Sequence, residues 1–126
     1  MPAYFRIDKK RRLVMSTISG VFTLTDGLAH QENLLKDLDF DPSFSQLLDC
    51  TQVTKVVLKP EDVRRLAQRS IFSPDAHRAI LVASDLVFGL ARIFMMVRET
   101  LGEKGIRVFY DRDEALYWVR REHSGD

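Results

Sequence analysis

Residues 77–110 constrain the fold of this chain more than any other segment. An apolar run at 79–83 is followed by a long helical pattern at 86–101 and then by a second apolar run at 106–110. A strand, a helix and a strand in about 34 residues is the size of a right-handed βαβ crossover. The segment therefore predicts an α/β fold with parallel strands, in which ligands usually bind at the carboxyl ends of the strands.

The N-terminal half predicts a hairpin, a helix and a third strand. Apolar residues alternate at 3–8 and 13–19, which we interpret as two antiparallel strands that end at Gly20. Thr25 or Asp26 is a suitable cap for the helix that follows. Residues 44–51 hold the third strand, and residues 52–59 are either a packed loop or a short extra strand. The side of the first helix expected to face inward is apolar, and it consists of Leu28, Leu34, Leu35 and Leu38.

Two further helices complete the predicted order. Pro60 suits the first position of a helix over residues 60–72, and Asp111 with Glu114 marks the start of a last helix. The elements then follow one another as β-β-α-β-α-β-α-β-α. We predict a single α/β domain, residues 1–126, with a mixed, mostly parallel sheet of about five strands flanked by about four helices. A chain of 126 residues that is 45% hydrophobic can bury one core of this size.

The element order and several short segments resemble the STAS domain, and more closely its SpoIIAA-like branch. The matching segments are the opening strand pair, Leu48-Asp49, Ala79-Ile80-Leu81-Val82, Phe88-Gly89-Leu90-Ala91-Arg92 and Val108-Phe109 with the helix after it. The resemblance implies either a signalling switch that binds protein partners or a relative of CRAL-TRIO-type domains that hold lipids. In the switch proteins a serine after the third strand is phosphorylated, whereas this chain has Asp49-Cys50-Thr51-Gln52 there. The nearest hydroxyls, on Thr51 and Thr54, lie outside that motif.

Composition excludes several classes of protein. Nineteen basic and eighteen acidic residues leave a net charge of +1, which argues against a nucleic-acid-binding protein. A single cysteine allows no internal disulfide, and the three histidines show no metal-binding spacing. We therefore expect no metal or cofactor. The chain shows no signal peptide and no apolar run of the ~18 residues that a membrane span requires, so we expect a cytoplasmic protein.

Polar residues at the predicted ends of two parallel strands form a first candidate site. They are Asp49, Cys50, Thr51, Ser84 and Asp85. In a parallel sheet these ends meet at one edge, which is the usual position of a ligand. The simpler interpretation is that Asp85, like Asp111, caps a helix. Cys50 is a nucleophile only with a base beside it, and His30, His77 and His123 give no such context, since His30 and His123 are expected on exposed helix faces.

The helix at 86–101 provides the second candidate site. Asp85, Arg92 and Glu99 recur every seven residues and form one narrow polar stripe, and most of the remaining surface is apolar. A helix that packs on one face of a sheet needs an apolar stripe of only about 100°, so part of this surface has to pack against something else. The candidates to cover this excess apolar surface are a neighbouring helix, a second subunit or an apolar ligand. The expected ligand or partner surface comprises Phe88, Gly89, Arg92, Met95 and Met96.

Three functional hypotheses follow. The first is a non-catalytic regulatory or binding module that recognises a protein partner or itself, as a homodimer, through the helix at 86–101. The second is a carrier or sensor of an apolar small molecule or lipid that lies between this helix and the helix at 60–72. The third, a small hydrolase that uses Cys50 or Ser84, has no supporting base in the sequence.

Overall fold

The computed structural model describes residues 3–69 and 71–120, and its elements follow the predicted order. They are β1 (Ala3–Asp8), β2 (Leu13–Thr23), α1 (Leu24–Lys36), β3 (Ser45–Val57), α2 (Pro60–Ala67), β4 (Arg78–Leu81), α3 (Asp85–Thr100), β5 (Ile106–Phe109) and α4 (Arg112–Arg120). None of the helices in this described part is both long and apolar enough to cross a membrane.

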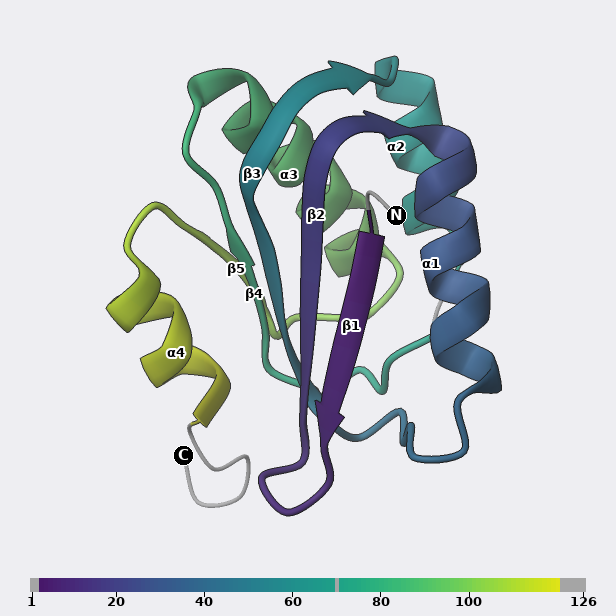
Figure 1. Ribbon diagram of the computed structural model, residues 1–126, viewed down its shortest axis with the longest axis vertical. Coiled ribbons are helices and arrows are strands. Elements are labelled where there is room, and N and C mark those ends of the chain that lie inside the picture. Colours follow the sequence, from purple (N-terminus) through teal and green to yellow (C-terminus); the bar gives the residue numbers. More distant parts are fainter. Residues whose placement is uncertain (1–2, 70, 121–126) are drawn as a thin grey trace.

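The five strands form one mixed sheet in the order β1-β2-β3-β4-β5. β1 pairs with β2 in the antiparallel sense, and the other three pairs are parallel. Because the parallel strands follow their order along the chain, each right-handed crossover places its helix on the same face of the sheet. Helices α1, α2 and α3 accordingly cover one face, and α4 alone packs on the other (Figure 1). The predicted α/β class and sheet type are confirmed.

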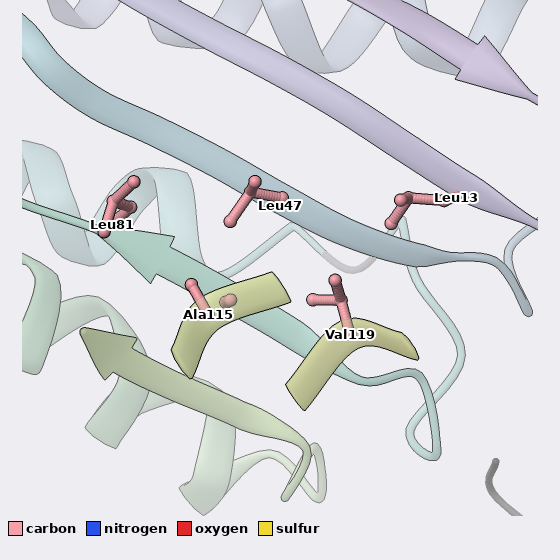
Figure 2. Close-up of a cluster of buried hydrophobic side chains, with 6 residues drawn as sticks. Leu13, Leu47, Leu81, Ala115 and Val119 are labelled. Atoms are coloured by element: carbon pink, nitrogen blue, oxygen red, sulfur yellow. The ribbon is translucent and has the colours of Figure 1, made fainter. Parts of the chain in front are cut away.

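The core consists of one layer on each side of the sheet. Figure 2 shows the layer beneath α4, where Leu13, Leu47 and Leu81 of neighbouring strands meet Ala115 and Val119 of the helix. Side chains alternate between faces along a strand. The preceding residue of β4, Ile80, therefore faces the other layer, in which it packs with buried residues of α3 and β5.

Two strands extend further than the sequence predicted. β2 does not end at Gly20 but continues to Thr23, and the register with β3 shifts on both sides of this glycine. Gly20 has a φ of 68°, a conformation that glycine adopts readily, so the strand bends there instead of stopping. The added length of β2 gives β3 a partner as far as Val57, which pairs with Thr23. Most of the uncertain segment 52–59 is therefore a continuation of β3.

The first helix begins earlier than predicted. Thr23 is its cap, and Asp26 lies three residues on in a capping box in which each side chain accepts from the other residue's backbone N–H at 3.2 Å. The proposed inner side was also wrong in part, because Leu35 and Leu38 are 41% and 101% exposed. The buried face of the helix is instead mixed in polarity, and it consists of Gly27, His30, Gln31 and Leu34.

The second helix is shorter than predicted. Pro60 does occupy its first turn, but the helix ends at Ala67 and not at residue 72. Ile71 and Phe72 are still buried, because the segment after the helix returns to the core beside Leu34. Helix α2 lies between α1 and α3 and contacts both.

Candidate functional site

A cavity of about 120 Å³ lies between the sheet and helices α1, α2 and α3. Most of its lining is apolar, with Ile80 on the sheet side, Val63 and Leu66 on α2, and Phe94 on α3. A protein cavity of about 150 Å³ with a similar lining accepts a benzene molecule, so this one matches a small apolar group. The cavity lies between α2 and α3, the two helices between which the sequence analysis placed an apolar ligand.

A chain of hydrogen bonds between buried side chains borders this cavity. Nη1 of Arg78 donates to both carboxylate oxygens of Glu103, at 3.0 and 2.9 Å, and Nε of Arg78 donates to Gln46 Oε1 at 3.2 Å. Nε2 of Gln46 donates to Ser16 Oγ at 3.1 Å, and Ser16 Oγ lies 3.0 Å from His30 Nε2. Ser16 thus accepts from Gln46, and whether it donates to His30 or accepts from it depends on which ring nitrogen of His30 carries the proton.

Strand register explains how these polar side chains come together. Gln46 and Arg78 are direct partners across β3 and β4, and Ser16 lies on the neighbouring strand β2. The side chain of each points to the same face of the sheet as the apolar side chain two positions further along its strand. Ile80 is that apolar residue for Arg78. His30, Gln46 and Arg78 also line the cavity. The cavity therefore has apolar walls and one polar side.

Two arginines share one carboxylate at the end of this chain. Arg98, in the last turn of α3, donates from Nε to Glu103 Oε1 at 2.8 Å and from Nη1 to the carbonyl oxygen of Ala67 at 2.8 Å. The guanidinium of Arg78 lies 4.3 Å from the ring centre of Phe72. Burial lowers the pKa of Arg78, and the nearby Glu103 carboxylate opposes that effect. The group carries two positive charges and one negative charge in the protein interior.

His30 is buried, although the sequence placed it on an exposed helix face. Its side chain contacts the ring of Phe5 edge-on, with the ring centres 5.7 Å apart. Burial, with a further contribution from the positive charge of Arg78, lowers the pKa of His30 to about 4. The imidazole is therefore neutral at neutral pH and takes part in the chain as a hydrogen-bonding group.

Gln31 has one polar atom that the described residues around it do not satisfy. Its Nε2 donates to the carbonyl oxygen of Leu66 at 3.0 Å, but Oε1 is buried and has no hydrogen-bond partner among the described residues. The side chain is 8% exposed and lines the cavity. A buried acceptor without a donor costs about 1–3 kcal/mol. A molecule in the cavity that offers a donor would remove that cost.

The sheet separates the residues predicted to form a site at the strand ends. Asp49 faces α4, where Oδ1 accepts from the backbone N–H and the hydroxyl of Thr51, at 2.9 and 2.6 Å, and Oδ2 accepts from Arg112 at 2.6 Å. Burial opposes ionisation of Asp49, but the hydrogen bonds from Thr51 and Arg112 give a net lowering of its pKa. Cys50 points to the opposite face and lines the cavity. Asp49 and Thr51 therefore share no site with Cys50.

Ser84 and Asp85 belong to the start of α3. Ser84, and not Asp85, is the cap, because its hydroxyl accepts from the backbone N–H of Val87 at 3.3 Å. Asp85 accepts instead from the hydroxyl of Tyr110 at 2.7 Å. The predicted cap of α4 is confirmed, since Asp111 Oδ1 accepts from the N–H of Glu114 at 3.0 Å.

The environment of Cys50 does not favour a nucleophile. Burial, with a further contribution from Asp49, raises the pKa of the thiol to about 12. His123, one of the histidines considered as a base, lies outside the described residues. Within residues 3–69 and 71–120, no three histidine, cysteine, aspartate or glutamate side chains are grouped as metal ligands.

The apolar surface of α3 is only partly covered by the described chain. Of its sixteen residues, Ala91 and Arg98 are buried. Phe88 stacks on Tyr110 with ring centres 5.3 Å apart, and Met95 packs on the core, so these two predicted surface residues are half-buried. The other three residues of the predicted surface are exposed, and they are Gly89, Arg92 and Met96.

Gly89 is not explained by close packing within the described chain. A Cβ atom built on it would meet no atom within 4 Å. The exposed face around it contains apolar side chains, with Leu86 66% and Met96 55% exposed. Leu86, Gly89, Ile93 and Met96 are spaced by three, four and three residues, so they form one stripe along the helix. The stripe lies on the outer side of α3, away from the cavity-lining Ala91 and Phe94.

Comparison with known proteins identifies the fold. No protein-family profile and no curated protein matches the chain. Among solved structures, the chain is similar to an uncharacterized protein of the DUF3478 family with a SpoIIAA-like fold, from Shewanella loihica PV-4. The similarity has a TM-score of 0.59 at 19% sequence identity and covers 93% of each chain. The fold is therefore SpoIIAA-like, as the sequence resemblance indicated.

Proposed function

We propose that this protein binds a small apolar molecule in the cavity between the sheet and helices α1, α2 and α3, and acts as a carrier or sensor of that molecule. The observation that carries the proposal is the composition of the cavity wall. Apolar side chains supply most of it, and the buried Oε1 of Gln31 lacks a donor among the described residues. Small-molecule sites typically combine an apolar lining with a few placed polar groups.

The position of the cavity supports a role as a sensor. It lies against α3, the helix whose outer side holds the apolar stripe Leu86, Gly89, Ile93 and Met96, and Ala91 and Phe94 line it from the inner side. A ligand that contacts the inner side of α3 can alter the position of that helix, and with it the surface offered to a partner. The role is non-catalytic, and a cytoplasmic location is part of the same proposal.

Native mass spectrometry and a titration with small aromatic compounds test the proposal. We expect the gently purified protein to bind at least one of toluene, benzyl alcohol, benzamide and benzoate. Ala91→Leu adds side-chain volume to the cavity and should weaken that binding at least tenfold. Gly89→Ala lies on the exposed side of the same helix and should leave it unchanged. If no compound binds and the native mass equals that of the chain alone, the proposal is wrong.

Self-association through the stripe on α3 is a second candidate function. The observation that favours it is the regular spacing of Leu86, Gly89, Ile93 and Met96, which suits antiparallel or parallel packing of two copies of the helix. Sedimentation velocity over a range of concentrations should then show a dimer. Met96→Glu should abolish the dimer without lowering the unfolding temperature. A wild-type protein that stays monomeric at all concentrations contradicts this candidate.

A further inference from the structure

The charges around the cavity indicate which chemical class of ligand it would hold. Of the described residues that line the cavity, Arg78 alone is charged at neutral pH, because His30 has a pKa of about 4. Arg78 is 8% exposed, so its charge lies within the protein rather than in solvent. An isolated buried charge is unfavourable unless an opposite charge compensates it.

The protein compensates this charge only in part. Glu103 accepts hydrogen bonds from Arg78 and from Arg98 at the same time, and it is 1% exposed. One carboxylate therefore faces two guanidinium groups, which leaves one positive charge in excess. The ring of Phe72, 4.3 Å from the Arg78 guanidinium, supplies a weaker cation–π attraction.

Arg78 also retains hydrogen-bonding capacity. Its Nε and Nη1 atoms are used by Gln46 and Glu103, whereas none of the hydrogen bonds between described residues involves Nη2. An arginine has five N–H donors in a fixed plane and prefers planar carboxylates as acceptors. Arg78 is thus a cavity-lining donor with both spare charge and a spare donor group.

We propose that the ligand of this cavity is a small hydrophobic monocarboxylate, with its carboxylate group at Arg78 and its apolar part between α2 and α3. The excess positive charge of Arg78, Arg98 and Glu103 favours a ligand with a negative charge. The apolar walls of the cavity favour a ligand whose remaining part is apolar. This inference rests on the proposed function. The cavity volume of about 120 Å³ suits an apolar part of roughly the size of a benzene ring.

Benzoate and benzamide form the matched pair that tests this inference. The two compounds have nearly the same shape and size. Only benzoate is charged, and only benzamide offers an N–H donor, which the unpaired Gln31 Oε1 would favour. Tighter binding of benzoate therefore reports the charge. Isothermal titration calorimetry at pH 7.5 should give a dissociation constant at least tenfold lower for benzoate. If benzamide binds as tightly as benzoate, the monocarboxylate inference is wrong although the proposed function stands. If neither compound nor toluene binds, the proposed function itself fails.

Two variants at Arg78 test whether this residue causes the preference for benzoate over benzamide. Arg78→Met removes the excess charge and leaves Arg98 paired with Glu103, so the variant should fold. It should lose the preference for benzoate and bind benzamide at least as tightly, because the carboxylate would then be buried without a counter-charge. Arg78→Lys keeps the charge and should retain a preference for benzoate. A preference that persists unchanged in Arg78→Met would overturn the assignment to Arg78. If Arg78→Met does not fold, the comparison of the two compounds on the wild-type protein still decides whether the cavity prefers a carboxylate.

Discussion

Arg78 and Glu103 meet inside the protein, with Nη1 of the arginine within 3.0 Å of both carboxylate oxygens, and both side chains are less than 10% exposed. The pair connects β4 to the segment that follows α3. Through Gln46 and Ser16 the same hydrogen-bonded chain reaches His30 on α1. The polar cavity residues His30, Gln46 and Arg78 are therefore part of a connected group of side chains from five different segments.

Removal of the shared carboxylate should destabilise the protein strongly. Glu103→Gln keeps the shape of the side chain but leaves Arg78 and Arg98 buried without a counter-ion, which should lower the free energy of unfolding by about 3–5 kcal/mol. Urea denaturation measures this change. Glu99→Gln, at an exposed position of α3, is the control and should change it by less than about 0.5 kcal/mol. A loss below about 1 kcal/mol in Glu103→Gln would show that the buried charges are compensated in another way.

His30 should make stability depend on pH in a defined window. In the folded protein its pKa is about 4, whereas in the unfolded chain it is close to the ordinary value of 6.5. Between these values the unfolded chain binds more protons, so the stability contributed by the neutral ring is complete above pH 6.5 and is lost as the pH falls toward 4. The loss should be on the order of 3 kcal/mol.

Urea denaturation at pH 7.5 and pH 4.5 checks the role of His30. His30→Gln does not titrate, and its amide, which both donates and accepts, can still form a hydrogen bond with Ser16. The stability of this variant should therefore change less between the two pH values than that of the wild type. Carboxyl groups with a lowered pKa, such as Asp49, also contribute stability that is lost as the pH falls. Wild type and variant share these groups, so their effect cancels in the comparison. Equal changes in wild type and variant would contradict a buried neutral imidazole.

Two glycines should respond to alanine in opposite directions. At Gly105 a Cβ atom would lie 2.1 Å from the carbonyl oxygen of Ala76, so Gly105→Ala should destabilise the protein by about 2–3 kcal/mol. At Gly89 a Cβ atom meets nothing within 4 Å, so Gly89→Ala should raise stability by up to about 1 kcal/mol through helix propensity. Thermal unfolding of the two variants measures both effects. A destabilised Gly89→Ala would point to a contact of this glycine with a second copy of the chain.

Cys50 should react slowly with thiol reagents. Its pKa of about 12 leaves almost no thiolate at neutral pH, and the side chain is 8% exposed. Labelling by a disulfide reagent should therefore follow the rate of protein opening and rise sharply in urea. Because Cys50 lines the cavity, a bound ligand should slow the labelling further. Rapid labelling of the native protein would revive the hypothesis of a catalytic cysteine.

The class of fold was predictable because it depends on patterns that are local in the sequence. Apolar runs separated by a helical pattern indicated the crossover around α3, and Pro60 indicated the start of α2. The lengths of β2 and β3 were not predictable from either strand alone. Each extends because the other provides a partner beyond Gly20, and that pairing joins residues far apart in the sequence.

The polar side of the cavity escaped sequence analysis for a different physical reason. Charged and polar residues such as His30, Gln46 and Arg78 are usually exposed, and they become buried only where partners satisfy them. The partners here lie on other strands and helices, so no local pattern marks them. One signal was present in the sequence: Gln46 and Arg78 occupy positions in strands where the alternation predicts an inward, apolar residue.

Methyl NMR spectroscopy during a titration with benzoate tests the central claim most directly, namely that the cavity beside Arg78 holds a small ligand. We predict that methyl signals of Leu66 and Ile80, which line the cavity, shift in a saturable manner, while those of Leu13 and Val119, on the opposite face of the sheet (Figure 2), do not. Signals that remain unchanged at Leu66 and Ile80, or that change only on the outer side of α3, would contradict it.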